Sequence, residues 1–254
     1  MENSIMSYRK KISKVFALVI MLFFLISSSM AQVVVSKSYD INSIENKSDK
    51  SVLYSQVDLL GSGWASQDFE APNDQYDCEG ADDFIVPTGG WTISSIDAYG
   101  SGAASISLVN VFFYQDNSGS PAATSFESFM SVTATNDGTG ILSFDLPSAV
   151  SLTPGHYWFS VQDASPYDPN GQWYWARTNS VYNTLANWRN PGDGFGTGAT
   201  TWTPVDTALS GTSDFAFVLY SADAATIPIS NMAIYLMLLL VGVVTIIQYR
   251  RKFA

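Results

Sequence analysis

The stretch "ISLVNVFFYQ", Ile106–Gln115, decides the fold class of this protein. Large apolar side chains occupy both its odd and its even positions. In an extended chain successive side chains point to opposite faces, so both faces of this segment are apolar. A strand of that kind belongs in the middle of a sheet and is covered on both sides. The stretch therefore predicts a central β-strand.

The segments around this strand predict further antiparallel strands. From Trp64 onward, short alternating apolar runs are broken by Gly, Pro, Asn and Asp, which is typical of strands joined by turns. No stretch between residues 56 and 220 has a helical period. In "DFAFVLYS", residues 214–221, the large side chains Phe215, Phe217 and Leu219 share one face, which suits a strand that closes a core. Strands are predicted over 83–86, 91–99, 106–115, 127–135, 140–146, 156–162, 172–177 and 214–220.

These patterns together predict an all-β protein. We expect an antiparallel β-sandwich of the jelly-roll type over residues 56–222. The Ser-, Asn- and Lys-rich residues 32–55 have weak periodicity and are expected to form a linker.

The N-terminus has the order of a secretory signal peptide. Four basic residues between positions 9 and 14 precede an apolar run over 15–26, and the small residues Ser29 and Ala31 follow. Cleavage after Ala31 would remove residues 1–31. An uncleaved anchor is the alternative, although the run is shorter than the ~20 residues that a spanning helix needs.

The C-terminal segment "IPISNMAIYLMLLLVGVVTIIQYRRKFA", residues 227–254, contains an apolar run over 232–247. The basic residues Arg250, Arg251 and Lys252 follow it. The run is just long enough for one transmembrane helix if flanking polar residues lie at the interfaces. With an exported N-terminus, the positive-inside rule places residues 32–226 outside the inner membrane.

This tail resembles the IPTL-CTERM and PEP-CTERM classes of bacterial sorting signals. Ile227-Pro228 matches the opening of the IPTL motif, and Ser230-Asn231 stands at its polar pair. Met232 occupies the place where that motif usually has Trp. The resemblance implies a sorting protease or transpeptidase of the exosortase type as a partner, and delivery to the cell surface or matrix. A retained membrane anchor is the alternative.

Charge and composition exclude several classes of function. Residues 32–226 hold five basic residues against 22 acidic ones, a net charge of −17. Nucleic acid is not expected as a partner, because phosphate binding needs clustered Lys and Arg. Cys78 is the single cysteine and His156 the single histidine, so neither an internal disulfide nor a Cys/His zinc site can form.

The acidic stretch 68–83 is the candidate for a metal site. Calcium takes several oxygen ligands from a short segment, and the candidate ligands are Asp74, Asp77, Asp82 and Asp83. A structural calcium is the one cofactor that the sequence suggests. A solvated acidic loop, in which Asp82 or Asp83 caps a turn, is the alternative.

The candidate ligand-binding residues lie between positions 173 and 202, which hold four of the seven tryptophans. Exposed aromatic rings stack on the apolar faces of sugars. Strand alternation places Trp173, Trp175 and Arg177 on one face. With Trp188 and Trp202, they are the candidates for a polysaccharide-binding face. Packing of these rings in the core is the alternative.

Three segments resemble a β-rich module of secreted bacterial proteins. They are "YDCEGADDFIVPTGGWTISSI" (76–96), "VNVFFYQD" (109–116) and "NWRNPGDGFGTGATTWTPV" (187–205), and the likeness covers residues 64–220. That module has no assigned activity, so the resemblance implies an exported jelly-roll-like domain and no chemistry.

No catalytic motif emerges from the sequence. A G-x-S-x-G elbow is absent, and no motif singles out a pair of carboxylates. We therefore expect a non-catalytic cell-surface or matrix protein with a structural or adhesive role, whose partner is a polysaccharide or a surface protein. A carbohydrate-binding module with an aromatic face is the second hypothesis, and a glycoside hydrolase or lyase is the third.

Overall fold

The structure, a computed structural model, describes residues 34–36, 50–136 and 140–221. The expected signal peptide and sorting tail, with Ala31, Ile227, Pro228, Arg250 and Arg251, lie outside these residues. None of the helices in the described part of the chain has the length and apolar composition of a membrane span.

The all-β prediction is confirmed, and every pair of strands is antiparallel. The strands are β1 (Val34–Ser36), β2 (Val52–Gln56), β3 (Leu59–Ala65), β4 (Glu79–Val86), β5 (Trp91–Ser101), β6 (Leu108–Gln115), β7 (Glu127–Asn136), β8 (Ile141–Leu152), β9 (Gly155–Asp163), β10 (Tyr174–Thr178), β11 (Asn187–Arg189), β12 (Thr203–Pro204) and β13 (Phe217–Ser221). Short helices are η3 (Asp74–Tyr76), α2 (Tyr167–Asn170) and α3 (Val205–Ala208).

Each of the eight predicted strands coincides with an observed strand, with shifted ends. Two differences stand out. β1 and the start of β2 lie inside the range 32–55 that the sequence predicts to be a linker, and they pair with β3 and β13. β3 was missed because glycines interrupt its alternation. A Cβ at Gly63 would lie 2.8 Å from the carbonyl oxygen of Trp175, so the close approach of β10 requires a glycine there.

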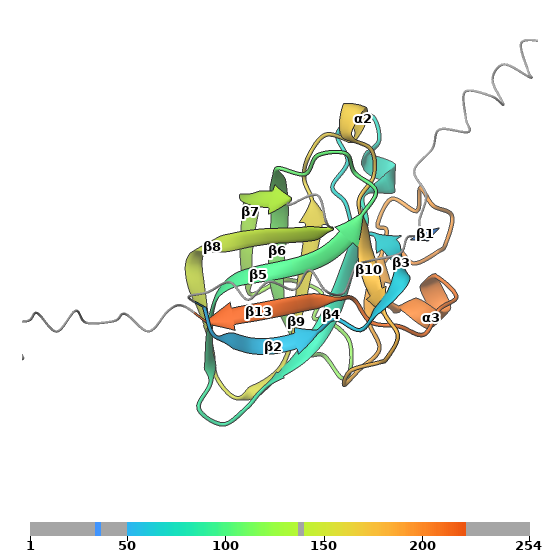
Figure 1. The fold of residues 1–254 in the computed structure, drawn as a ribbon. Helices are drawn as coiled ribbons and strands as arrows, with labels where there is room; N and C mark the ends of the chain where they lie inside the picture. The colour runs from blue at the N-terminus through green and yellow to red at the C-terminus, as the bar shows by residue number, and fades with distance from the viewer. Residues whose placement is uncertain (1–33, 37–49, 137–139, 222–254) are drawn as a thin grey trace, which may run out of the picture. The chain divides into compact units, whose positions relative to one another are not determined.

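The strands form one sheet that curls into two facing layers. One layer runs β2-β13-β5-β8 and the other runs β4-β9-β6-β7. In Figure 1 the strands of the first layer lie side by side in front, and those of the second cross behind them. The pairs β6·β7, β5·β8 and β4·β9 are nested in sequence, so each pair encloses the previous one around the β6–β7 connection.

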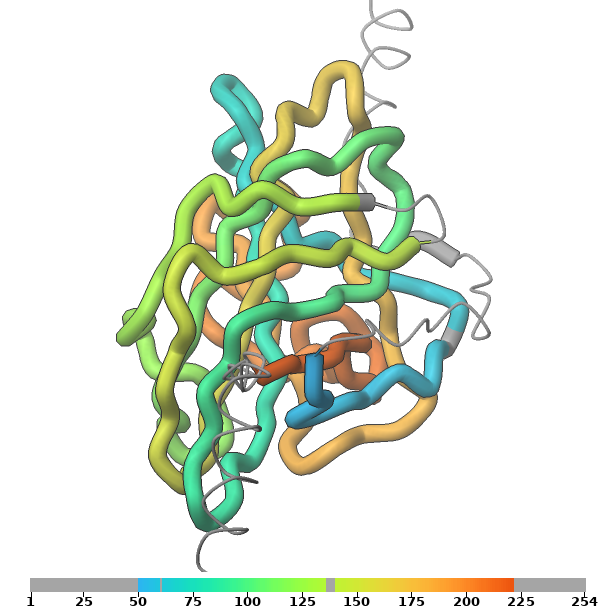
Figure 2. Tube along the Cα trace, turned by 60° about the vertical axis from the view of Figure 1, so that its left-hand side comes forward, coloured from blue at the N-terminus to red at the C-terminus, as the bar shows by residue number. Residues whose placement is uncertain are grey.

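Strand β7 passes from one layer to the other. Its first part pairs with β6, whereas Ala134–Asn136 pair with β8. Figure 2 follows this turn along the trace. Two small extensions complete the sheet: β10 pairs with β5 and β3, and β11 pairs with β4 and β12.

The main core lies between the two layers, and β6 has the central position that its sequence predicts. It pairs with β7 on one side and β9 on the other. Val109, Val111 and Phe113 have no exposed surface and belong to the main core. Tyr114 points to the opposite face, where it packs in a small second cluster with Ala81 and Trp158. Both faces of β6 are therefore covered, which explains why apolar side chains occupy both of them.

Candidate functional site

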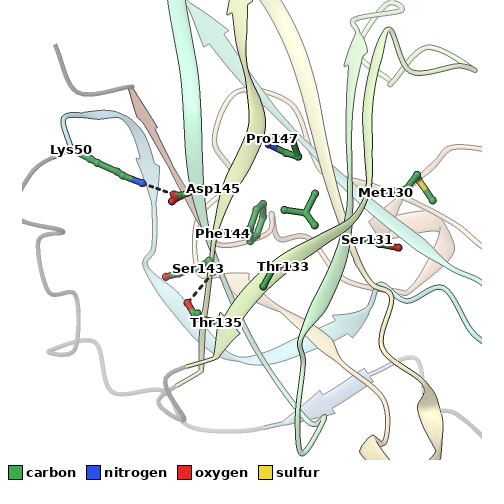
Figure 3. Close-up of a pocket in the computed structure, with 10 residues that line it drawn as sticks. Lys50, Met130, Ser131, Thr133, Thr135, Ser143, Phe144, Asp145 and Pro147 are labelled. Carbon is green, nitrogen blue, oxygen red and sulfur yellow. Dashed lines mark hydrogen bonds and ion pairs between the residues drawn. The ribbon is translucent and has the colours of Figure 1, made fainter. Parts of the chain in front are cut away.

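A groove opens where β7 and β8 separate. The two strands pair only where Ala134–Asn136 meet Leu142–Phe144. Beyond this point β7 turns into the layer of β6, while β8 continues beside β5. The groove has a volume of about 600 Å³, within the range typical of small-molecule sites. Figure 3 shows side chains of both strands along it.

Hydroxyl groups and one ion pair line this groove together with four apolar side chains. The lining residues are Lys50, Met130, Ser131, Val132, Thr133, Thr135, Ser143, Phe144, Asp145 and Pro147. The exposed Ser131 and Thr133 have hydroxyls without a hydrogen-bond partner among the described residues. At one end, the Lys50 ammonium pairs with Asp145 Oδ1. A groove that combines free hydroxyls with a few charges can bind a polar, hydroxyl-rich molecule through hydrogen bonds.

Three of the five candidate aromatic and Arg residues are core tryptophans. Trp173 is 2% exposed, and Trp175 and Trp188 are 0% exposed. The Trp175 ring stacks on Phe215 with centroids 4.4 Å apart, and its Nε1 donates to the Ala216 carbonyl at 2.9 Å. The two alternatives for these rings are a polysaccharide-binding face and packing in the core. Core packing describes the position of all three in the structure.

Arg177 and Trp202 are half-buried and lie in different surroundings. The Arg177 guanidinium lies 4.2 Å above the ring of Trp64 and donates to two serine hydroxyls. Trp202 packs with the small cluster on the other face of β6, and the Arg189 guanidinium lies 4.2 Å above its ring. Trp202 is thus separate from the ring pair Trp173 and Trp175, which stack on each other in the main core.

The four candidate calcium ligands divide between two places. Asp74 belongs to η3 and Asp77 follows it, where Asp77 Oδ1 accepts a hydrogen bond from the Phe69 N–H at 2.7 Å. Asp82 and Asp83 lie in β4 and have no exposed surface. In the described ranges, no three His, Cys, Asp or Glu side chains converge closely enough to bind a metal ion.

Asp82 is a buried link between the two layers. Its Oδ2 accepts hydrogen bonds from Gln56 Nε2 at 2.8 Å and from the Phe215 N–H at 2.5 Å. Both donors come from the β2 and β13 side of the fold, whereas Asp82 belongs to β4. Burial raises the pKa of Asp82 well above its usual value, and the nearby Asp214 carboxyl adds to this.

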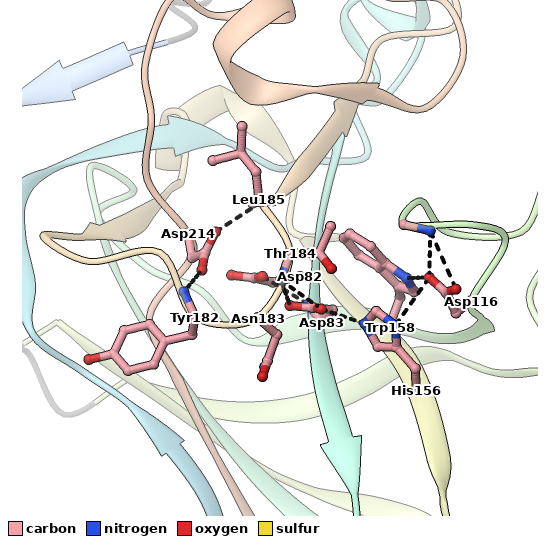
Figure 4. A network of polar contacts seen from close by, with 12 residues as sticks. Asp82, Asp83, Asp116, His156, Trp158, Tyr182, Asn183, Thr184, Leu185 and Asp214 are labelled. Carbon is pink, nitrogen blue, oxygen red and sulfur yellow. Dashed lines mark hydrogen bonds and ion pairs between the residues drawn. The ribbon is translucent and has the colours of Figure 1, made fainter.

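Asp83 and Asp214 hold the loop between β10 and β11. The Thr184 N–H donates to Asp83 Oδ2 at 3.0 Å. The N–H groups of Tyr182 and Ala186 donate to the two oxygens of Asp214. Figure 4 shows these carboxylates beside the loop residues Tyr182, Asn183 and Thr184. Three alternate N–H groups of one loop are therefore satisfied by two buried carboxylates, which fixes the loop's position.

His156 lies between two carboxylates. Its Nε2 contacts Asp83 Oδ2, and its Nδ1 lies 3.4 Å from Asp116 Oδ1 (Figure 4). Burial raises the pKa of Asp83, and the hydrogen bond with His156 opposes this shift. Both ring nitrogens of His156 therefore lie next to carboxylates.

Sequence reasoning missed the groove and Asp214. The groove exists because two strands that are neighbours in sequence diverge, and no motif marks such a divergence. Asp214 is the first residue of a predicted strand, and its partners Tyr182 and Ala186 are 32 and 28 residues away. The acidic stretch did indicate Asp82 and Asp83, but as candidate calcium ligands or turn caps.

Comparisons with known proteins identify no family. The chain matches no protein-family model and no curated protein sequence. It is similar in structure to a chain with the cysteine protease and lectin-like domains of Cwp84, a surface-layer-associated protein of Clostridium difficile. The identity is 12%, the TM-score is 0.46, and the match covers 71% of this chain and 37% of that one. A likeness this weak transfers no activity.

Proposed function

We propose that this protein is a non-catalytic interaction protein of the cell surface or extracellular matrix that binds a polysaccharide in the groove between β7 and β8. The observation that carries the proposal is the groove itself. Its volume of about 600 Å³ accommodates a few sugar units, and its exposed Ser131 and Thr133 hydroxyls are free to hydrogen-bond them. Sugar hydroxyls both donate and accept, as do these side chains.

Two features support an open binding surface rather than a catalytic pocket. Among the described residues that line the groove, Asp145 is the single carboxylate, whereas glycoside hydrolysis uses a pair of carboxyl groups at a set separation. His156 has both ring nitrogens next to carboxylates and does not line the groove.

The proposal includes export and a jelly-roll fold. The basic residues, apolar run and small residues that end at Ala31 support a signal peptide. Ile227-Pro228, the apolar run and Arg250-Arg251 support a sorting tail, with a retained membrane anchor as the alternative. The nested strand pairs and the two four-strand runs support the jelly roll.

Affinity electrophoresis of the full-length protein in detergent tests the proposal. The gels contain a soluble mixed-linkage glucan, xylan, galactomannan or partly deacetylated chitin. We expect at least one polysaccharide to retard the protein, and Thr133→Arg to abolish the retardation by filling the groove. Thr92→Arg is the matched control, because Thr92 is also an exposed strand threonine but lies outside the groove. Equal loss in both variants, or no retardation by any polysaccharide, would contradict the proposal.

A further inference from the structure

The three basic residues in the described part of the chain have different surroundings. Arg177 is committed to Trp64 and two serines, and Arg189 forms an ion pair with the buried Glu79 at 2.6 Å. Lys50 has a single partner, Asp145, and both line the groove. Of the described cationic groups, the Lys50 ammonium is thus the one bound only by an exposed carboxylate.

Asp145 is the more accessible member of this ion pair. Its side chain is 73% exposed, whereas that of Lys50 is 22% exposed. Only its Oδ1 is engaged by Lys50, so the second oxygen can accept a hydrogen bond from a ligand. Exposed ion pairs contribute little to stability, so a ligand ammonium can compete with Lys50 for this carboxylate. Figure 3 shows the pair at one end of the groove.

The charge of the domain favours a cationic ligand. The described residues include three basic residues against 17 acidic ones. The summed field of such a surface concentrates cations near it and repels anions, beyond the effect of any single contact. This field would repel an acidic polysaccharide, whereas it would attract a polymer with ammonium groups.

We propose that the groove between β7 and β8 selects a glycan that carries free amino groups, such as a deacetylated amino-sugar polymer. Asp145 binds the ammonium group, Ser131 and Thr133 bind the sugar hydroxyls, and Lys50 is an internal competitor for Asp145. The inference rests on the proposed function, since it names the class of polysaccharide that the same groove binds. It adds a charge requirement that a neutral glycan site would lack.

Calorimetric titration of the full-length protein in detergent tests this inference. The probes are a hexamer of glucosamine, its N-acetylated counterpart and an oligogalacturonate of equal length. We expect the glucosamine hexamer to bind most tightly, with an affinity that falls as salt is added. Asp145→Asn should weaken its binding about threefold, the effect expected for the loss of an exposed charge pair. Lys50→Gln should tighten it, because Asp145 loses its competitor.

Asp206→Asn is the matched control. Asp206 is an exposed carboxylate in α3 outside the groove, so its loss changes the net charge equally. Equal effects of Asp145→Asn and Asp206→Asn would overturn the inference, as would tightest binding of the oligogalacturonate. Binding of the N-acetylated hexamer with equal affinity and no response to Asp145→Asn would overturn the amino-group selectivity and leave the proposed function standing. Binding of none of the three probes would overturn this inference, and retardation by a neutral polysaccharide in the affinity gels would then leave the proposed function standing.

Discussion

Replacement of Trp175 by alanine measures how much a core tryptophan of the predicted binding face contributes to stability. The ring has no exposed surface, stacks on Phe215 at 4.4 Å and meets the edge of Phe159 at 5.3 Å. Its Nε1 also satisfies the Ala216 carbonyl. A role in sugar stacking would require an open face, which this ring lacks.

The expected loss follows from two contributions. Truncation of a buried tryptophan to alanine costs about 3–5 kcal/mol, because it removes apolar contacts and leaves a cavity. The Ala216 carbonyl keeps the Tyr99 N–H as a donor at 3.1 Å, so the loss of the Nε1 hydrogen bond adds only about 1 kcal/mol. We therefore expect the free energy of unfolding to fall by about 4 kcal/mol or more. In a domain of this size that corresponds to a decrease in Tm of about 8–16 °C.

Urea denaturation followed by tryptophan fluorescence and circular dichroism gives the difference in unfolding free energy. Trp202→Ala is the matched control, because Trp202 is half-buried and its Nε1 has no hydrogen-bond partner among the described residues. We expect its loss to be less than half that of Trp175→Ala. A Trp175→Ala variant that loses less than about 1 kcal/mol and no longer binds polysaccharide would refute the reasoning.

Three further predictions follow from particular contacts. Gly100→Ala should destabilise the fold by about 1–3 kcal/mol in urea denaturation, because its Cβ would lie 2.1 Å from the Nε1 of Trp173. Asp214→Asn should speed proteolytic cleavage within residues 179–186, since an amide cannot accept from both N–H groups that the carboxylate now binds; an unchanged cleavage pattern would count against this contact. Burial raises the pKa of both Asp77 and Asp163 to about 6 from an ordinary 3.8, so the folded state binds more protons than the unfolded state between those values. Their contribution to stability is therefore complete below about pH 4 and is lost as the pH rises through about 6, and Asp163→Asn should flatten the measured decline in Tm over this range.

Local sequence patterns are sufficient to predict the strands because a strand's alternation reflects which of its faces is covered. Ile106–Gln115 is apolar on both faces, and the structure gives its strand β6 neighbours on both sides and cover on both faces. The sequence does not predict β2, a short strand that pairs with β13 near the C-terminal end of the described residues. No local sequence pattern predicts that β7 passes from one layer to the other.

The candidate site was less predictable, because its residues come together only through tertiary contacts. The sequence positions of Trp173 and Trp175 are compatible both with a sugar-binding face and with the core. The burial of their rings in the structure distinguishes these two roles. The sequence predicts calcium ligands or turn caps for Asp82 and Asp83. Their burial is tolerable because distant donors satisfy them. Gln56 and the Phe215 N–H donate to Asp82 and the Thr184 N–H donates to Asp83, and these donors lie 26, 133 and 101 residues away.

The sequence by itself determined the all-β class, most of the strands and the acidic character, since alternation and composition are properties of short segments. Only the tertiary structure decided that the tryptophans pack inside, that two carboxylates hold the β10–β11 loop, and that a groove opens between β7 and β8. Those outcomes depend on which distant segments share a layer. A polar or aromatic side chain is buried stably only when its hydrogen-bond or packing partners lie beside it in the fold. Here those partners are distant in sequence, so short-range patterns do not indicate them.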